Sequence, residues 1–206
     1  MYMTKKTKRN QKRTNNKTSK VKRRNGSLYF SDFPDFRPNL TPREMFSMGS
    51  FGGTYWRPIY SSVTQKHYKN VHRKYPFLHG IEETMMSSKE YDKQKNKYGV
   101  KVGTSLEFWE GKKWITRYHP YGWVHWYCDF YKGKRSPDDR RQIDRWNNLA
   151  GAKGRFFKFL VTQIQKKKKE FKDESVSPKI RQVLQHWAYK INAKDFNKEL
   201  NSRKNN

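Results

Sequence analysis

The sequence has a single cysteine, few acidic residues and no long hydrophobic run. Cys128 cannot form an internal disulfide on its own, and its isolation excludes a zinc site built on CxxC pairs. No stretch reaches the ~18 consecutive apolar residues that a membrane-spanning helix needs, and the N-terminus lacks the apolar centre of a secretory signal. We therefore expect an intracellular protein without a transmembrane segment.

The shortage of acids leaves a large positive charge. The 206 residues hold 47 Lys and Arg against 18 Asp and Glu, which gives a formal net charge of +29 and a sequence pI of about 10.2. Charge of this size repels itself in a compact chain and attracts polyanions. The sequence therefore predicts a nucleic-acid partner, with DNA favoured over RNA and a membrane surface as the rival polyanion.

Aromatic residues are abundant although only 33% of the chain is hydrophobic. The 13 Phe, 13 Tyr and 7 Trp make up 16% of the residues, which is not typical of a disordered basic chain. We expect one domain flanked by two basic segments. The predicted parts are a disordered basic arm over 1–27, a globular helical nucleic-acid-binding domain over 28–192 and a basic tail over 193–206.

The arm contains eleven Lys and Arg residues and no acid. It cannot bury enough apolar surface to fold alone, and extended at ~3.3 Å per residue it would reach about 90 Å along a nucleic-acid backbone. The string KVKRR at 20–24 also fits a localisation signal. Phosphate contacts are predicted in the arm for Lys5, Lys6, Lys8, Arg9, Lys12, Arg13, Arg23 and Arg24.

Several residue patterns predict where helices begin. Thr41-Pro-Arg-Glu44 combines an N-cap, a proline at the first helical position and a capping-box acid. Thr104-Ser-Leu-Glu107 predicts a helix that ends at Gly111, and Ser136-Pro-Asp-Asp139 predicts one that runs to about Leu149. The aromatic run GWVHWYCDFY favours a buried helix. Helices are predicted over about 42–48, 104–111, 122–131 and 137–149.

Another helix is predicted after Ser177-Pro178. Its apolar residues follow a helical period, so we expect them to face inward and the polar residues to face outward. The predicted inner positions are Ile180, Val183, Leu184, Trp187 and Ala188, and the outer ones are Lys179, Arg181, Gln182, Gln185 and His186. Strands are indicated only over 54–60 and 98–102. The predicted fold class is mainly α, with α+β containing a few short strands as the alternative.

Two glycine-rich loops are candidates for phosphate binding, because glycine lets backbone N–H groups approach an anion closely. The first carries Gly49, Gly52 and Gly53, and it lacks the Gly-Lys-Ser/Thr ending of a nucleotide-hydrolysing loop. Its alternative role is a tight turn under packed aromatic residues. The second is Gly151-Ala-Lys153-Gly154, which lies between two predicted helices and resembles a backbone clamp; a capping glycine followed by a loop is its alternative.

Basic side chains cluster around the second loop. The helix from Pro137 is expected to bury Ile143, Trp146 and Leu149 and to expose its arginines as a rigid face that reads a groove or a backbone. The predicted nucleic-acid contacts outside the arm are Arg140, Arg141, Arg145, Gly151, Lys153, Gly154, Arg155, Lys158 and Arg181. The aromatic residues Trp56, Tyr121, Trp123, Trp126 and Tyr127 are candidates for stacking on unpaired bases, with core packing as the alternative.

Catalytic residues are harder to identify. After the helix-capping acids are set aside, Glu110 and Asp129 remain as weak candidates for a metal-dependent nuclease or a glycosylase base. The six histidines form no HxxxH or HExxH pattern on a predicted helix, so no metal site and no cofactor is predicted.

Several strings together resemble an uncharacterised domain family of large DNA viruses, algae, fungi and some bacteria. They are GSFGGTYWRPIYS at 49–61, GW..WYC.FY.G.R at 122–135, RQI.RW at 141–146, G.KGRF at 151–156 and SP.IRQ.L.HW at 177–187. The resemblance spans roughly residues 30–190 and implies no established activity. Two positions depart from the family pattern: His125 replaces an expected Gln, and Asp129 replaces an expected basic residue, which favours local pairing of Asp129.

These observations together predict a nucleic-acid-binding protein that contacts phosphates and reads bases little. The alternatives are a virion structural or genome-packaging protein and a DNA-processing or repair enzyme. The predicted location is the nucleus, a viral factory or the interior of a virion. The sequence leaves the oligomeric state open.

Overall fold

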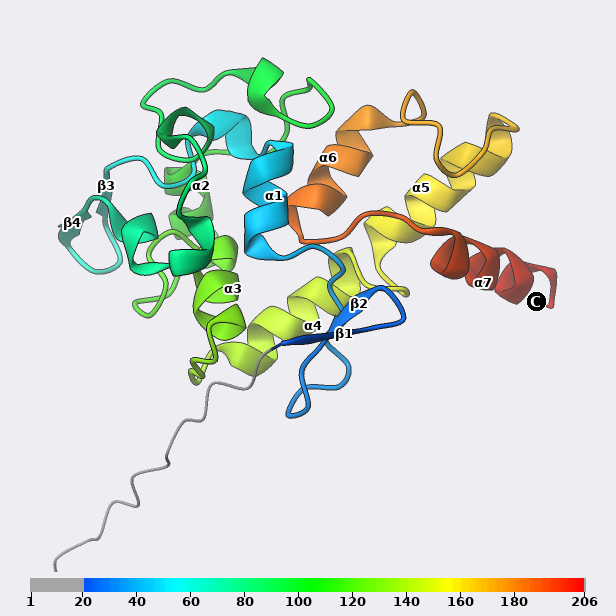
Figure 1. Cartoon of the computed structure of the whole chain (residues 1–206), viewed down its shortest axis with the longest axis horizontal. Coiled ribbons are helices and arrows are strands. Elements are labelled where there is room, and N and C mark those ends of the chain that lie inside the picture. Colours follow the sequence, from blue (N-terminus) through cyan, green and yellow to red (C-terminus); the bar gives the residue numbers. More distant parts are fainter. Residues whose placement is uncertain (1–20, 206) are drawn as a thin grey trace, which may run out of the picture.

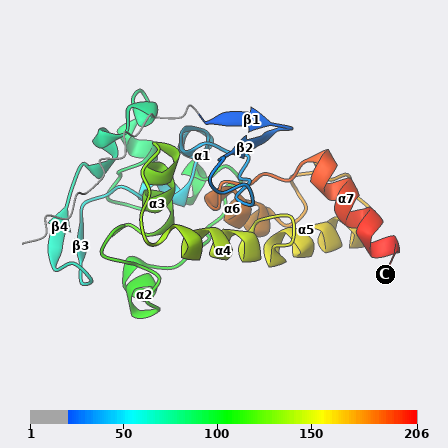
Figure 2. The same cartoon turned by 90° about the horizontal axis from the view of Figure 1, so that it is seen from below.

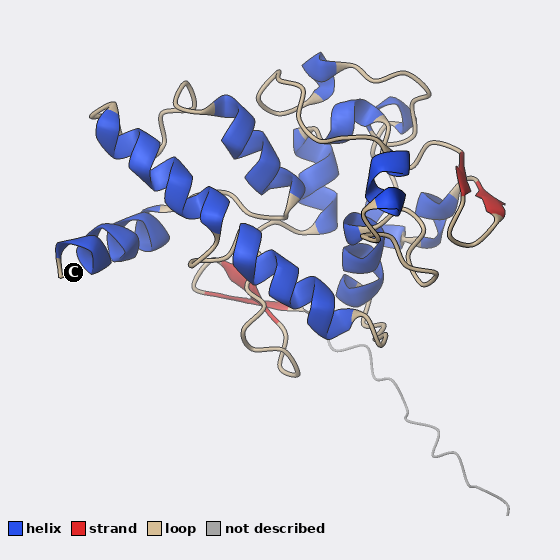
Figure 3. Ribbon diagram, turned by 180° about the vertical axis from the view of Figure 1, so that it is seen from behind, coloured by secondary structure: helices blue, strands red, loops and turns tan. Residues whose placement is uncertain are grey.

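The computed structural model describes residues 21–205. Helices dominate this part of the chain, and the strands form two separate antiparallel pairs (Figure 1, Figure 3), so the predicted mainly α fold class is confirmed. The described helices are α1 (Pro42–Met48), α2 (Leu106–Gly111), α3 (Trp123–Tyr131), α4 (Asp139–Leu149), α5 (Arg155–Lys166), α6 (Pro178–His186) and α7 (Ala193–Lys204). The described strands are β1 (Lys22–Arg24), β2 (Ser27–Tyr29), β3 (Ile59–Ser61) and β4 (Lys66–Tyr68).

Helix α1 begins as its sequence predicts. The Thr41 hydroxyl accepts a hydrogen bond from the Glu44 N–H at 3.1 Å, and the Glu44 carboxylate accepts one from the Thr41 N–H at 2.7 Å. This reciprocal capping box satisfies two amides that the helix itself leaves open. Helix α4 ends at the predicted Leu149, and the buried aromatic helix α3 is also present.

The N-terminal hairpin differs from the expected arm. Strands β1 and β2 pair in the register Lys22 with Tyr29, and Asn25 and Gly26 take positive φ angles of 52° and 83° at the turn. Asn-Gly is the preferred pair for a two-residue hairpin turn. Arg23 also forms an ion pair with Glu44 of α1. Residues 22–27, which the sequence assigned to the disordered arm, therefore belong to the fold.

The C-terminal segment is a helix, where the sequence predicted a basic tail over 193–206. Arg203 of α7 donates to the Lys158 carbonyl of α5 at 3.0 Å. Phe196 and Leu200 pack against the hydrophobic core. The tail prediction missed these two side chains, which attach α7 to the body of the protein.

The second predicted strand is absent from the described chain. Residues 98–102 are irregular, because side chains take the backbone groups that a neighbouring strand would otherwise bond. The Tyr98 N–H donates to the Gln182 side chain at 3.0 Å, and the Val100 carbonyl accepts from the Asn96 amide at 2.7 Å. The first predicted strand, over 54–60, is shortened and shifted to β3.

The core is built mainly from aromatic rings around α3. Residues 123–130 are all buried, as expected of a helix that is apolar on every side, and α3 packs against α1 and α4. Phe36 lies in the middle, with its ring centroid 5.5 Å from Trp126 and 5.2 Å from Trp146. Phe36 belongs to residues 30–41, the lead-in between β2 and α1, and this segment thereby joins α3 to α4.

Helix α6 is oriented differently from the prediction. Arg181, Gln182, Gln185 and His186, expected outside, are all buried, whereas Val183 is only half-buried. The physical reason is hydrogen bonding: the Gln185 side chain donates to the Met45 carbonyl at 2.7 Å, and Gln182 donates to the Gly49 carbonyl at 3.2 Å. Buried polar side chains are stable where they satisfy backbone groups in this way.

Figures 1 and 2 together place the β3–β4 hairpin and α7 at opposite ends of the molecule, with α2 at its edge (Figure 1, Figure 2). Residues 69–104 run through short 3₁₀ turns and loops on the β3–β4 side (Figure 1). This arrangement leaves a cleft between α2, the glycine-rich loop after α1 and the ends of α4, α5 and α6.

A candidate nucleic-acid interface

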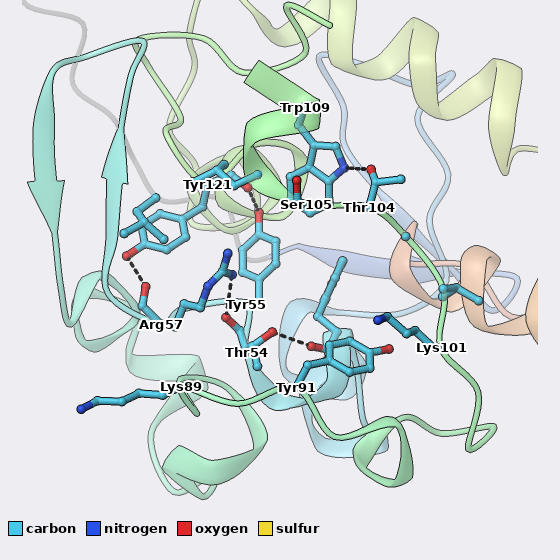
Figure 4. A pocket seen from close by; sticks show the side chains of 15 residues that line it. Thr54, Tyr55, Arg57, Lys89, Tyr91, Lys101, Thr104, Ser105, Trp109 and Tyr121 are labelled. Atoms are coloured by element: carbon cyan, nitrogen blue, oxygen red, sulfur yellow. Dashed lines mark hydrogen bonds between the residues drawn. The ribbon is translucent and has the colours of Figure 1, made fainter. Parts of the chain in front are cut away.

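Two adjoining cavities form the cleft. The first chamber, of about 440 Å³, lies between α2 and the segments around residues 51–59 and 89–105. Figure 4 shows the side chains of Tyr91, Trp109 and Tyr121 around it, with Lys101 beside the Tyr91 ring. The Trp109 indole is held by a 2.7 Å hydrogen bond from its Nε1 to the Thr104 hydroxyl. The aromatic wall of this chamber is therefore fixed in place.

The second chamber, of about 520 Å³, continues the cleft toward α4, α5 and α6. Arg145 and Asn148 of α4, Arg155 and Phe156 of α5, and Trp187 line it. The residues that line both chambers are Phe51, Tyr55, Gly103, Thr104, Trp109 and Tyr121. The two cavities can therefore be occupied by one extended ligand.

The charged residues of the cleft are all basic. Arg57, Lys89 and Lys101 line the first chamber, Arg145 and Arg155 line the second, and no Asp or Glu lines either. Within residues 21–205 none of these five cations forms an ion pair. An apolar cleft lined by unpaired cations favours an anionic ligand, because the surrounding low-dielectric walls concentrate the field.

Exposed aromatic rings stand at the mouth of the cleft. Tyr91, Phe108 and Trp114 are 37%, 42% and 41% exposed, and Phe108 and Trp114 meet edge to face with centroids 5.8 Å apart. These rings were not predicted from the sequence. The predicted base-stacking residues are all buried in or against the core: Trp56, Tyr121, Trp123, Trp126 and Tyr127.

Arg145 is the cation with the most unusual surroundings. Its guanidinium lies 5.4 Å from the ring centroids of both Trp114 and Trp187, and it donates to the Gln142 side chain at 3.0 Å. Burial lowers the pKa of the Arg145 guanidinium to about 10, so the group stays charged at neutral pH. A positive charge between two indole faces is stabilised by cation–π attraction and remains available to an anion.

The other arginines of α4 do not reach the cleft. Arg140 is paired with Asp35 at 2.6 Å and with Asp144 at 2.7 Å, and Arg141 bonds the Asp138 carboxylate. Arg140 is exposed as predicted and Arg141 is partly exposed, but acids pair with both guanidinium groups, so they are less available to phosphate than the sequence alone suggests. Only Arg145 of the predicted face lines the cleft.

The loop Gly151–Gly154 lies where the sequence predicts, but its glycine amides are bonded internally. The Gly151 N–H donates to the Trp146 carbonyl and the Gly154 N–H to the Gly151 carbonyl, and a Cβ at Gly154 would lie 2.6 Å from Leu149 backbone atoms. Close packing explains these glycines better than phosphate clamping. Arg155, the first residue of α5, lines the second chamber, while Lys153 and Lys158 are exposed and do not line either chamber.

The N-terminus of α5 nevertheless borders the second chamber. Gly154 is the N-cap and has no side chain to cap the helix, and Arg155 and Phe156 of the first turn line the cavity. Helix N-termini attract anions because their first N–H groups lack intrahelical acceptors. This end of α5 adds to the positive field of Arg145 and Arg155.

The loop with Gly49, Gly52 and Gly53 is not a phosphate loop in this structure. Its three N–H groups donate to the Phe46 carbonyl, the Asn96 side chain and the Ser50 carbonyl, respectively. All three glycines have positive φ, and a Cβ at Gly49 would lie 2.2 Å from the Lys95 carbonyl oxygen. The loop is a tight turn packed under residues 82–97, as the alternative interpretation held.

Arg181 is also excluded as a surface contact. It is 3% exposed and donates to the carbonyls of Val176, Phe171 and Asp173 at 2.8–2.9 Å. Its guanidinium closes the loop between α5 and α6. Burial lowers the pKa of Arg181 relative to its ordinary value.

The two catalytic candidates do not converge. The Glu110 carboxylate accepts hydrogen bonds from Ser61 and Ser62 and thereby attaches the β3–β4 hairpin to α2. Asp129 is 8% exposed and accepts from the Tyr75 hydroxyl at 2.7 Å, with Lys74 3.7 Å away. Both carboxylates therefore have structural partners, and the local pairing expected for Asp129 is present.

A polar cluster surrounds Asp129. His119 Nε2 lies 3.8 Å from its carboxylate, and Lys74 Nζ lies 3.0 Å from His125 Nε2. Burial lowers the pKa of His119 to about 4 and that of His125 well below its ordinary value, so both rings are neutral at pH 7. Across residues 21–205 no three His, Cys, Asp or Glu side chains are placed to hold a metal ion together.

Some predicted contacts lie beyond the described part of the chain or at its edge. Lys5, Lys6, Lys8, Arg9, Lys12 and Arg13 fall outside the described residues. Arg23 is paired with Glu44, and Arg24 lies over the Tyr29 ring at 3.6 Å. Neither of these two arginines lines the cleft.

Comparison with known proteins finds no matching family, no matching curated protein and no matching solved structure. The resemblance to a domain family of large DNA viruses therefore stays a prediction. No helix within residues 21–205 combines the length and the apolar character needed to cross a bilayer.

Proposed function

We propose that this protein binds nucleic acid, DNA in preference to RNA, through phosphate contacts with little base readout. The observation that carries the proposal is the cleft, whose five basic side chains form no ion pair with any acid in the described part of the chain. On α4 itself, Arg140 and Arg141 are paired with neighbouring acids, whereas Arg145, which lines the cleft, is not paired with any acid of residues 21–205. A phosphate backbone supplies the anions that these five cations lack.

The overall charge supports the same proposal. Residues 21–205 contain 39 of the 47 basic residues and all 18 acids, so they carry +21 without the first twenty residues. Electrostatic attraction of this size acts on any phosphate backbone regardless of sequence. The cleft adds a place where an anionic chain is bound between fixed walls.

The test is a salt titration of binding to a labelled mixed-sequence oligonucleotide. If about six phosphates are neutralised, log affinity should fall against log salt with a slope of about −5. The variant Lys89→Gln/Lys101→Gln should weaken binding and make this slope less steep by about 2, because two phosphate contacts are lost. A slope near zero for the natural protein would reject nucleic-acid binding.

The matched control is Lys194→Gln/Lys198→Gln. Both lysines are exposed on α7, at the far end of the molecule from α2 (Figure 1), and the variant makes the same change of charge. It should bind with nearly the natural affinity. Equal weakening by the two variants would mean that diffuse charge, and not the cleft, binds the nucleic acid.

The alternative functions use the same charge. A genome-packaging protein would bind through its whole basic surface and would respond equally to the two lysine variants. A DNA-processing enzyme needs a reactive centre, and neither Glu110 nor Asp129 lines the cleft. The predicted intracellular location, in a nucleus, a viral factory or a virion interior, remains part of the proposal.

A further inference from the structure

We infer that the second chamber of the cleft accepts an unpaired nucleobase, so that the protein prefers a single strand to a duplex. This inference rests on the proposed nucleic-acid binding and specifies its ligand. It is carried by three features of the chamber: exposed ring faces at its mouth, a cavity of suitable size, and hydrogen-bond donors without acceptors on its walls.

The exposed aromatic rings are suited to stack on a flat ligand. Phe108 and Trp114 keep about two-fifths of their surface in solvent although an apolar cavity lies beside them. In a duplex the faces of a base are covered by its neighbours, and only its edges are open in the grooves. Rings of this kind can stack only on bases that have left the duplex.

The cavity has the dimensions of a ligand site. Its volume of about 520 Å³ lies inside the range of roughly 300–1,000 Å³ that is usual for small-molecule pockets. Its walls are mostly aromatic, with Trp109, Phe156 and Trp187 among them. A heterocyclic base fits this combination of size and apolar lining, whereas a paired helix is too wide to enter.

Two of the polar side chains that line the chamber, His186 and Arg145, have hydrogen-bond donors without acceptors. His186 is 5% exposed, and its Nε2 accepts a hydrogen bond from the Phe51 N–H at 3.0 Å. Burial lowers the pKa of His186 to about 3, so the ring is neutral and carries its single proton on Nδ1. Within residues 21–205 Nδ1 of His186 has no hydrogen-bond partner, and the Arg145 guanidinium also has N–H groups that donate to no acceptor there.

Hydrogen-bond donors that lack acceptors are better suited to bind a nucleobase than an apolar ligand. Ring nitrogens and carbonyl oxygens of bases are acceptors, and an unpaired base exposes them on its open edge. The phosphates on either side of such a base would lie near Arg155 and the α5 N-terminus, and near the first chamber with Lys89 and Lys101. One strand can thereby use both halves of the cleft.

The test compares three probes on the full-length protein at one salt concentration: a fluorescein-labelled 12-nucleotide DNA strand, its duplex, and the same strand as RNA. The DNA strand should bind about tenfold more tightly than the duplex. The variant Phe108→Ala/Trp114→Ala should lose about tenfold in affinity for the strand and change duplex binding less than about twofold. Both side chains are about two-fifths exposed and neither belongs to the hydrophobic core, so the fold should tolerate their removal.

Phe159→Ala is the matched control, because Phe159 is 47% exposed on α5 and lines neither chamber. It should leave both affinities unchanged. A second measurement avoids substitution: a strand carrying 5-iodouracil should photocrosslink to residues that line the second chamber. A crosslink confined to other surfaces would overturn the inference even if the aromatic variants fail to fold.

The outcomes separate the inference from the function on which it rests. Salt-dependent binding that is equally tight for strand and duplex, and insensitive to the Phe108 and Trp114 changes, would reject the base pocket and retain nucleic-acid binding. Binding of none of the probes would reject both. Tighter binding of the RNA strand than of the DNA strand would support the base pocket and overturn the preference for DNA.

Discussion

The rings of Phe51 and His186 stack with centroids 3.9 Å apart and planes inclined by 16°, while the Phe51 N–H donates to His186 Nε2. This double contact joins the loop after α1 to the end of α6, residues that are 135 positions apart in the sequence. Both residues also line the second chamber of the cleft. The stability of the protein should therefore depend on the imidazole of His186.

Replacement of His186 should destabilise the fold. His186→Ala leaves the Phe51 amide without its acceptor and opens a gap beside the ring, so we expect a loss of about 3 kcal/mol in the free energy of unfolding. Urea denaturation measures this loss. His67→Ala, at an exposed position, should change the same free energy by less than about 0.5 kcal/mol. Similar effects of the two changes would contradict the structural role of His186.

Acid should destabilise the protein well before its carboxylates titrate. Burial lowers the pKa of His119 to about 4 and that of His186 to about 3, whereas an unfolded histidine has a pKa near 6.5. Between these values the unfolded chain binds more protons, so stability is complete above about pH 7 and falls as the pH falls from about 6.5 to 4. Each histidine contributes about 3 kcal/mol to this loss.

Unfolding free energies at pH 7, 6, 5 and 4.5 measure the effect. His119→Gln should remove about a third of the loss, because the buried rings of His125 and His186 contribute the rest, and the exposed His67→Gln should remove none. Carboxylates with lowered pKa, such as Asp138 beside Arg141, contribute only at more acid pH because their unfolded value is already 3.8. Flat stability between pH 7 and 5 would show that the buried histidines do not control the acid response.

The loop that contains Gly49, Gly52 and Gly53 should have a structural role, which replacement of a glycine by alanine tests. Gly49→Ala places a Cβ about 2 Å from a backbone oxygen at a positive φ, so we expect a loss of about 3 kcal/mol or more. Gly26→Ala is the control: its φ is also positive, but no atom lies within 4 Å of the added Cβ, and about 1 kcal/mol should be lost. Nucleic-acid affinity of folded Gly49→Ala should be unchanged; a large loss of affinity would restore the phosphate-loop interpretation.

Two truncations should separate the N-terminal charges from the hairpin. Removal of residues 1–20 deletes eight basic residues and should weaken nucleic-acid binding and reduce its salt slope without lowering the melting temperature. Removal of residues 1–27 also deletes β1 and the Arg23 contact to Glu44, and should lower the melting temperature by about 5 °C. Complete loss of binding on removing residues 1–20 would mean that the cleft does not bind nucleic acid by itself.

The helices were predictable where the signal is local. Thr41 and Glu44 lie three positions apart, and their reciprocal bonds form within one helical turn. At α4 the Asp139 carboxylate accepts from the Ser136 N–H, but the helix begins at Asp139, two residues after the predicted start at Pro137. Signals of this range therefore place a helix start to within about two residues, independently of what the helix later packs against.

The faces of α6 were not predictable from periodicity. Gln182 and Gln185 are polar, and their burial depends on carbonyl groups at Gly49 and Met45 that are more than 130 positions away. A pattern within α6 contains no information about these acceptors. The wrong orientation also hid the role of Trp187 and His186, which line the second chamber.

The cleft was only partly predictable for the same reason. Arg145 and Arg155 were recognised from the density of basic residues around them, but Arg57, Lys89 and Lys101 stand apart in the sequence and meet only in the fold. Conversely, Arg140 and Arg141 are equivalent to Arg145 in the sequence pattern, but in the fold they are bonded by Asp35, Asp138 and Asp144. Ion pairing within the fold decides which cations remain available.

The position of Arg145 between Trp114 and Trp187 has a consequence for selectivity. A long side chain usually gives up its rotamer freedom when it binds a ligand, which costs about 0.5–1.5 kcal/mol. Arg145 has largely given it up already in the free protein, because two indoles and Gln142 hold it. Such a preorganised group cannot follow a badly placed anion, so the chamber should discriminate among ligands by shape more than a flexible lysine patch would.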